Sequence, residues 1–492
     1  MGRPPASARG FPWEHFVTAT ATRRPIRLPA HPPEQAAAGD DQPDWGATRC
    51  LIGATATAAL VGTPVGLLLG YWAGTGQMVS VPWTGLVQAH GQLQLFGWLG
   101  LSILGVTFHA MAHLFQTATP PARLTWIVLL LQLGGVGLRL VAPLAPWAAG
   151  APGTVSAWLL LASSLALLGA FGVTMEAHLR TLPRRSPDRR APTVLPKFLL
   201  SGLALWALAL LVNLDGAIQA VRQGIAGAGA LDVAHDALIV AMTGGGLAMI
   251  ALGMSLRVVV GWLDLPAPNL RRAGQVWVPL LIGTLLRAFR PGVEALSPAA
   301  GAVLAVAGNV LWAGAVLWYL PILRGLWLPD AVRPGGGARG EADPPLAWFV
   351  RLAHAWLLAA AVLGVAEALI MVGDRLGTAT WSATAAGDAA RHALLFGFLG
   401  VLTAGLTGRL PTAFLEIGEV AVRATRHSYR LAWFALLVAT MLRVAAPLVA
   451  PLRTPLLIGA GTAGSLGLLC LLWSLVAVGF LAAKRPSAVQ PA

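Results

Sequence analysis

Three histidines stand near the start of three similar segments of the chain. His90 lies in AHGQLQLFGW, His235 in AHDALIVAMTGGG and His392 in RHALLFGFLG. Because the chain has only 10 histidines, three copies in phase indicate an internal repeat. A neutral imidazole is a common ligand of haem iron and copper, so the three side chains are candidates for metal or haem ligation. The alternative is that each histidine packs between helices and hydrogen-bonds across them.

Each of these segments is followed by one arginine in the next apolar run. The three are Arg139, Arg287 and Arg443. The spacings from histidine to arginine are 49, 52 and 51 residues (139 − 90, 287 − 235 and 443 − 392). Haem carries two propionates, which need cationic partners when they are partly buried, and the arginines lie where such partners would be needed.

The composition shows what kind of element must position these residues. Of 492 residues, 56% are hydrophobic and 11% are charged, and the mean hydropathy is +0.70. An ordinary soluble domain has about 25% charged residues, so a soluble enzyme and a disordered or fibrous protein are excluded. Cys50 and Cys470 lie at or inside apolar runs, so no disulfide framework or cysteine zinc site is expected.

The chain is predicted to be an all-α integral membrane protein, with membrane domain 49–483 between a polar cytoplasmic N-terminal tail (1–48) and a cytoplasmic C-terminal tail (484–492). Continuous apolar runs long enough to cross about 30 Å of hydrocarbon favour transmembrane helices over strands. The twelve expected helices are 50–73, 85–110, 124–143, 155–178, 198–219, 233–261, 275–289, 298–323, 346–372, 390–413, 431–447 and 455–482. Four helices at a time give repeat units of about 50–180, 196–325 and 346–483, with the histidines on helices 2, 6 and 10. His354 is expected at the membrane interface near the start of helix 9, and His178 in a cytoplasmic connection.

The distribution of Lys and Arg predicts the orientation in the membrane. If the N-terminus is cytoplasmic, the connections on that side hold 16 Lys and Arg, and the opposite connections hold 5. Both termini are therefore expected in the cytoplasm, with the three histidines near the outer face. The formal net charge of +14 is explained by the cytoplasmic side, so the lipid bilayer is the expected partner and nucleic acid is not.

This layout resembles subunit I of the haem–copper oxidase superfamily, in which histidines begin helices 2, 6 and 10. Ala89–Gly91 followed by Phe96 is similar to that superfamily's second-helix motif. Within this wider circle the chain looks most like the NnrS family, linked to the response to nitric oxide and described as binding haem and copper. The matching parts are QLFGW at Gln94–Trp98 and, in the segment Arg391–Arg409, the residues His392, Ala393, Leu394, Gly397, Gly400 and Arg409.

The resemblance implies a haem protein of a bacterial-type inner membrane that acts on nitric oxide or in nitrosative stress. It implies that His90 and His392 are axial haem ligands and that His235 stands where the superfamily places a copper histidine. The oxidase's paired histidines on helix 7 are missing, and its His-x-His pair on helix 10 is reduced to His392, so an oxygen-reducing binuclear centre is not expected. Two alternatives stay open: a transporter without cofactor, and a degenerate nitric oxide or oxygen reductase subunit.

Overall fold

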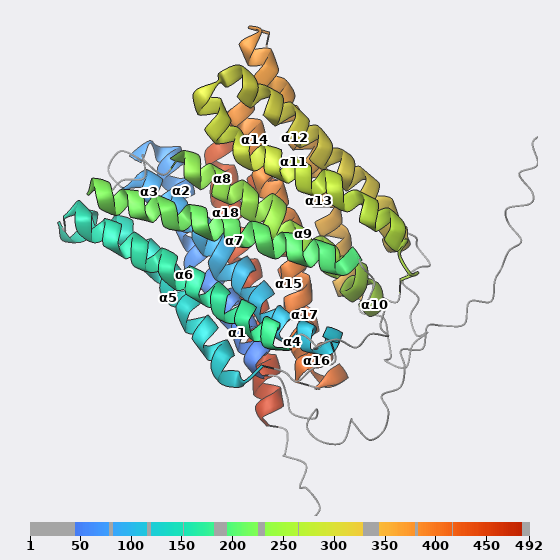
Figure 1. Cartoon of the computed structure of the whole chain (residues 1–492). Helices are drawn as coiled ribbons and strands as arrows, with labels where there is room; N and C mark the ends of the chain where they lie inside the picture. Colours follow the sequence, from blue (N-terminus) through green and yellow to red (C-terminus); the bar gives the residue numbers. More distant parts are fainter. Residues whose placement is uncertain are drawn as a thin grey trace, which may run out of the picture. The chain divides into compact units, whose positions relative to one another are not determined.

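The structure is a computed structural model that describes residues 45–77, 82–115, 120–150, 152–181, 194–224, 232–263, 265–327, 344–378, 382–415 and 417–484. All of them belong to one compact unit, Pro43–Ala492. Every regular element in these ranges is helical, and twelve helices within them are long and apolar enough to cross a membrane. The expected all-helical, multi-pass fold is thus confirmed (Figure 1). The predicted tails lie outside the described residues, apart from 45–48 and Lys484.

The labels follow the chain, with η for π-helical and 3-10 segments. Spans 1–4 consist of α1 (Trp45–Thr57), η2 (Ala58–Gly62) and α2 (Thr63–Thr75); α3 (Trp83–Gln92), η4 (Leu93–Gly100) and α4 (Leu101–Phe115); α5 (Ala122–Ala149); and α6 (Gly153–Thr181). Spans 5–8 consist of α7 (Val194–Gln223); α8 (Asp232–Val240), η6 (Ala241–Leu247), α9 (Ala248–Met254), η7 (Ser255–Val259) and α10 (Val260–Trp262); α11 (Leu270–Leu296); and α12 (Pro298–Tyr319) with η8 (Leu320–Leu326). Spans 9–12 consist of α13 (Pro344–Arg375); α14 (Ala383–His392), η9 (Ala393–Gly400), α15 (Val401–Thr407) and α16 (Leu410–Phe414); α17 (Gly418–Ala445); and η10 (Ala450–Leu452) with α18 (Arg453–Ala483).

The seventh and eleventh spans are longer than their apolar runs predict. α11 has 27 residues and α17 has 28. α11 starts at the cap residue Asn269, whose side chain accepts a hydrogen bond from the backbone N–H of Arg272 (3.1 Å). Arg271 and Arg272 thus belong to the helix although they are not apolar. Charged side chains at helix ends reach the polar boundary of the bilayer, so counting apolar residues underestimates helix length.

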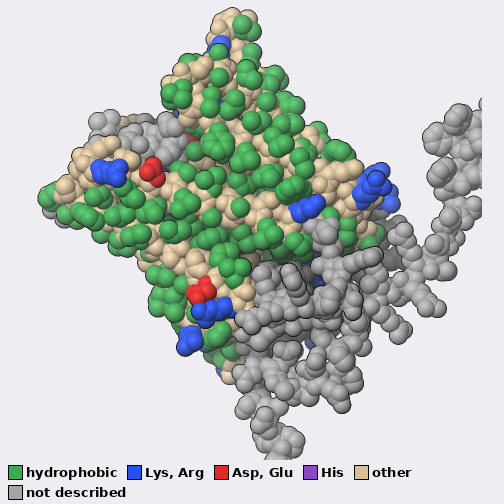
Figure 2. Space-filling view, viewed as in Figure 1, with side chains coloured by type: hydrophobic (Ala, Val, Ile, Leu, Met, Phe, Trp, Pro, Cys, Tyr) green, Lys and Arg blue, Asp and Glu red, His purple; other side chains and the backbone are tan. Residues whose placement is uncertain are grey.

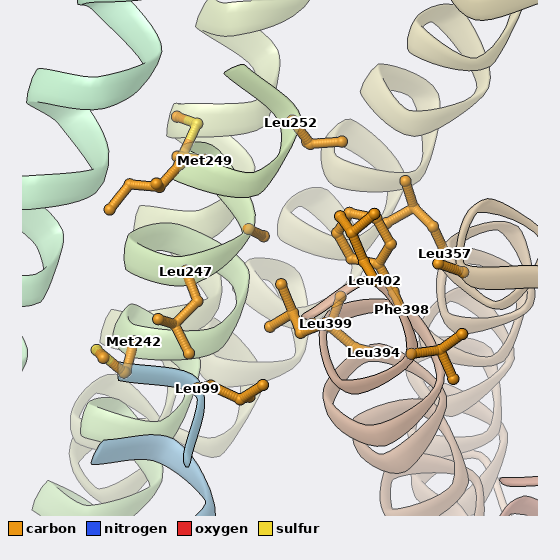
Figure 3. Close-up of a cluster of buried hydrophobic side chains, with 14 of the residues drawn as sticks. Leu99, Met242, Leu247, Met249, Leu252, Leu357, Leu394, Phe398, Leu399 and Leu402 are labelled. Atoms are coloured by element: carbon orange, nitrogen blue, oxygen red, sulfur yellow. The ribbon is translucent and has the colours of Figure 1, made fainter. Parts of the chain in front are cut away.

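The second, sixth and tenth spans form the interior of the bundle. In these spans 72%, 78% and 78% of the 18-residue apolar segment is buried inside the protein, against at most 50% in any other span of the described residues. Their leucines and other apolar side chains meet one another and the ninth span, as Figure 3 shows for Leu99, Leu247, Phe398 and Leu357. A site shielded from lipid is therefore expected on these three spans.

Each of the three inner spans contains a π-helical stretch, namely η4, η6 and η9. A π-helix is rare and often occurs at functional sites. η6 contacts both η4 and η9, so the three stretches lie together in the bundle. No sequence pattern predicted them.

The outer surface suits a hydrocarbon environment. Large apolar side chains such as Leu130 (64% exposed) and Val303 (65%) point outward. Figure 2 shows a face made mostly of hydrophobic side chains, with few charged ones. Such a surface on a soluble protein would promote association, whereas lipid covers it without cost. Neighbouring outer spans pack against each other along the chain, and α18 of the last span packs on α2 of the first.

Candidate functional site

His90 is held between the first and second spans. Its Nδ1 lies 2.9 Å from the backbone oxygen of Gly62, at the end of η2. Because a carbonyl oxygen only accepts, Nδ1 carries the proton and Nε2 keeps its lone pair. The ring lies against Gly66, where a Cβ would stand 2.6 Å from the ring carbon Cε1. The imidazole of His90 therefore occupies space that a side chain at position 66 would fill.

His392, the last residue of α14, is held by a carboxylate instead. Its Nδ1 lies 2.9 Å from the backbone oxygen of Asp388 and 3.1 Å from the carboxylate oxygen Oδ1 of the same residue. Both atoms are acceptors, so Nδ1 is again the protonated nitrogen and Nε2 carries the lone pair. A carboxylate behind a histidine is the usual arrangement for fixing a metal-ligating imidazole.

Arg443 of α17 completes this group. Its two terminal nitrogens donate to the two oxygens of Asp388, at 2.9 and 3.2 Å, which is a bidentate ion pair. The sequence predicted Arg443 as a partner for a propionate, and the structure gives it a carboxylate from the chain itself. Asp388 was missed, although an aspartate four residues before a histidine lies on the same helical face.

His90 interacts electrostatically with both His392 and Arg443. Further into the bundle, the second and tenth spans meet through aromatic rings. Trp98 and Phe396 have ring centroids 6.1 Å apart. A Cβ on Gly400 would stand 2.9 Å from the Trp98 ring, so the indole is packed tightly against the tenth span. Its Nε1 is buried without a hydrogen-bond partner.

His235 lies within electrostatic range of Arg139 and Arg391. Arg139 is 3% exposed and donates to the side-chain oxygen of Gln88 (3.2 Å). Among the described residues no carboxylate forms an ion pair with Arg139. In the same part of the chain, no three His, Cys, Asp or Glu side chains gather as a metal site.

The third predicted arginine, Arg287, lies over the indole of Trp312, with its guanidinium carbon 5.0 Å from the ring centroid. It is on α11, beside η6 of the sixth span. Glu367, the carboxylate that interacts electrostatically with Arg287, forms an ion pair with Arg290 (3.1 Å). Arg287 therefore does not join the histidine pair.

When the three inner spans are aligned on their π-helical stretches, the residues at the common position are not the three predicted histidines. Gln88, His235 and Asp388 each lie twelve residues before the last residue of their π-helical stretch (100 − 88, 247 − 235 and 400 − 388). His90 and His392 lie two and four residues further along from this common position. The histidines are thus not strictly in phase. An arginine of the following span binds the residue at this position in two cases, Arg139 with Gln88 and Arg443 with Asp388.

Two other histidines are placed differently from the expectation. His354 lies ten residues inside α13 and is 0% exposed, with its Nδ1 2.8 Å from the backbone oxygen of Val350. His178 is buried near the end of α6, and its Nε2 lies 3.1 Å from Oγ1 of Thr107. The prediction for His178 was wrong because α6 continues to Thr181, beyond the expected end of that helix. His354 is enclosed by neighbouring spans, and sequence hydropathy does not show which helical face meets another span.

The fold and these residues define a helical protein with twelve membrane-spanning helices and with two imidazoles that are held through Nδ1 and lie within electrostatic range of each other. No protein-family model matches the chain, and no curated protein is significantly similar to it in sequence.

Proposed function

We propose that the protein binds haem between His90 and His392 and acts in the response to nitric oxide or nitrosative stress, in the manner of the NnrS family. The observation that carries the proposal is the fixed protonation of both imidazoles. Each donates its Nδ1–H to an oxygen of the chain, so each has an Nε2 lone pair free for iron. The corresponding contacts of Gln88 and Asp388 support three repeated four-helix units, and with them the oxidase-like layout.

The donor set fits a haem. Histidine is the usual protein ligand of haem iron, and His90 and His392, from different spans, would be the residues that hold it. Arg139 supplies a buried positive charge with only a neutral partner, as a propionate requires. Arg443 is neutralised by Asp388, so its role is to fix the carboxylate that orients His392.

When bound, haem would supply a redox-active iron centre to the response to nitric oxide. The chain's own residues would hold the iron through Nε2 of His90 and His392, compensate one propionate through Arg139 and keep water out with the apolar inner spans. A copper ion held by the same two histidines is the alternative occupant. Multi-pass insertion in a bacterial-type inner membrane, with both termini cytoplasmic, belongs to the same proposal.

An optical spectrum of the purified full chain tests it. We expect a Soret band and a pyridine haemochrome, both lost in His90→Ala and in His392→Ala and retained in His427→Ala, whose side chain is exposed. Asp388→Asn should retain the fold and weaken haem binding by about 10–100-fold, the usual effect of losing a partner behind a ligating histidine. A folded wild-type protein without colour after expression with added haem would refute the proposal, and bound copper in place of haem would favour the alternative.

A second candidate is a transporter without cofactor, favoured by the buried charge of Arg139 without a carboxylate partner among the described residues. Uptake of nitrate or nitrite into vesicles containing the haem-free protein, abolished by Arg139→Gln, would support this function over the first.

A further inference from the structure

Two hydrogen-bond donors, on Arg287 and Trp312, lie close to Gly244 of the sixth span. A Cβ built on Gly244 of η6 would lie 3.6 Å from Nη1 of Arg287 and 3.7 Å from Nε1 of Trp312. The hydroxyl of Thr284 lies 3.8 Å from the same point. The seventh span, through Arg287 and Thr284, and the eighth span, through Trp312, thus face the side of the sixth span where Gly244 has no side chain.

Neither nitrogen has an acceptor. Arg287 Nη1 and Trp312 Nε1 are buried without a hydrogen-bond partner, and Trp312 is 2% exposed. Thr284 directs its own hydrogen to the backbone oxygens of Gly244 (3.1 Å) and Leu280 (2.9 Å). Leaving a buried donor unpaired is costly, and more so for a charged group, so native proteins rarely do it without a reason.

Within the described ranges no carboxylate forms an ion pair with Arg287, which lies over the Trp312 ring and interacts with Glu367 only at longer range. Glu367 binds Arg290 (3.1 Å), and Glu294 binds both Arg290 (3.2 Å) and Arg375 (3.4 Å). Three arginines therefore share two carboxylates on this part of the seventh and ninth spans. An ionisable group inside a membrane usually has a partner and a task.

We propose that Arg287 and Trp312 bind a compact planar oxyanion, of the carboxylate or nitrate kind, beside Gly244. The groups offered are donors, which suits an anion and excludes a metal cation. A guanidinium matches the flat face of two oxygens, and the indole N–H supplies a second direction. The site is independent of the haem proposal, because none of its residues touches His90 or His392.

Gly244→Ala separates binding from folding. Its new methyl group would meet its neighbours at 3.6 to 3.8 Å, which is ordinary van der Waals contact, so the protein accommodates it. The methyl group would nevertheless occupy the place of the anion. Trp312→Phe keeps an aromatic ring and removes the N–H together with the five-membered part of the indole. Gly169→Ala is the matched control, because its Cβ would meet only Leu131, at 3.6 Å, in the fourth span.

Isothermal titration calorimetry of the purified full chain with sodium formate and sodium nitrate, at constant ionic strength, tests the proposal. We expect one anion per chain, the same affinity in Gly169→Ala, and a dissociation constant raised about tenfold or more in Gly244→Ala and Trp312→Phe, as for the loss of a hydrogen bond in a charged pair. Absence of binding to the wild type, or unchanged binding in Gly244→Ala, overturns it.

Two further measurements decide the chemistry and the source of the anion. Chloride binding with equal affinity would overturn the oxyanion class, because a sphere does not use the flat guanidinium face. If formate binds only to the haem-free protein, a haem propionate fills the site in the haem-bound protein. This result would overturn the proposal that the site binds a free oxyanion. Formate binding that is unchanged by haem content supports the site even if the haem proposal fails.

Discussion

At the scale of single residues, His90 and His392 reach the same protonation state by different means. A backbone carbonyl fixes His90, and a carboxylate fixes His392. The two imidazoles thus offer the same ring nitrogen, Nε2, to a metal, although a neutral group orients one and a charged group orients the other. The ring of His90 depends in addition on the space that Gly66 leaves.

Gly66→Ala tests that space. The methyl group would stand 2.6 Å from Cε1 of His90, so the ring must move and its hydrogen bond to Gly62 must break. We expect haem affinity to fall about 10–100-fold, as when a ligand loses its orienting partner, measured by haem titration of the apoprotein. Gly137→Ala, with open space around its Cβ, should bind as the wild type does. Equal affinities in both variants would contradict the role of Gly66.

At the scale of elements, the π-helical stretches change how the inner spans present their side chains. In η4 the oxygen of Phe96 accepts the backbone N–H of Leu101 and also the side-chain amide of Gln132 on α5 (2.8 Å). Gln132 is 1% exposed, so this hydrogen bond is shielded from water. A polar side chain from a neighbouring span thus supports the irregular backbone, as membrane helices require.

Gln132→Leu should therefore lower the free energy of unfolding by about 1 kcal/mol, the value of one buried hydrogen bond. Unfolding in mixed detergent micelles measures it. Gln223→Leu, at an exposed position near the end of α7, is the control and should change little. If both variants were equally stable, the hydrogen bond to Phe96 would not support η4.

At the scale of the whole molecule, the first and last spans lie side by side, so the outer spans close around the inner ones. α18 packs on α2, and the hydroxyl of Ser465 lies 3.0 Å from that of Thr63. Residues 402 positions apart in the chain are thus neighbours. This contact encloses the side of the bundle on which Gly62 and Gly66 hold His90.

A double cysteine variant tests this closure. In a protein with Cys50→Ala and Cys470→Ala, Thr63→Cys with Ser465→Cys should form a disulfide on mild oxidation, since the two hydroxyls are already in contact. After proteolysis between the two positions, the fragments should stay linked until reduction. The pair Thr63→Cys with Thr462→Cys, whose second side chain is exposed, should not link. Separate fragments from the first pair would contradict the closed arrangement.

The orientation predicted from the basic connections can be tested independently of any ligand. We expect alkaline phosphatase fused within 182–193, which contains Arg184, Arg185, Arg189 and Arg190, to be inactive, and the same enzyme fused within 225–231 to be active. A fluorescent protein at the C-terminus should be bright. The opposite pattern would place both termini outside the cytoplasm.

The sequence by itself determined the helical class, the number of spans and the choice of His90 and His392, because apolar run length is a local property and histidines are rare in such runs. Only the tertiary structure paired Asp388 with His392 and Arg443, and left Nη1 of Arg287 and Nε1 of Trp312 without an acceptor. These facts depend on the register between distant spans. Since each residue turns a helix by about 100°, a shift of two residues sends a side chain to another face, and no pattern along one span shows what stands opposite.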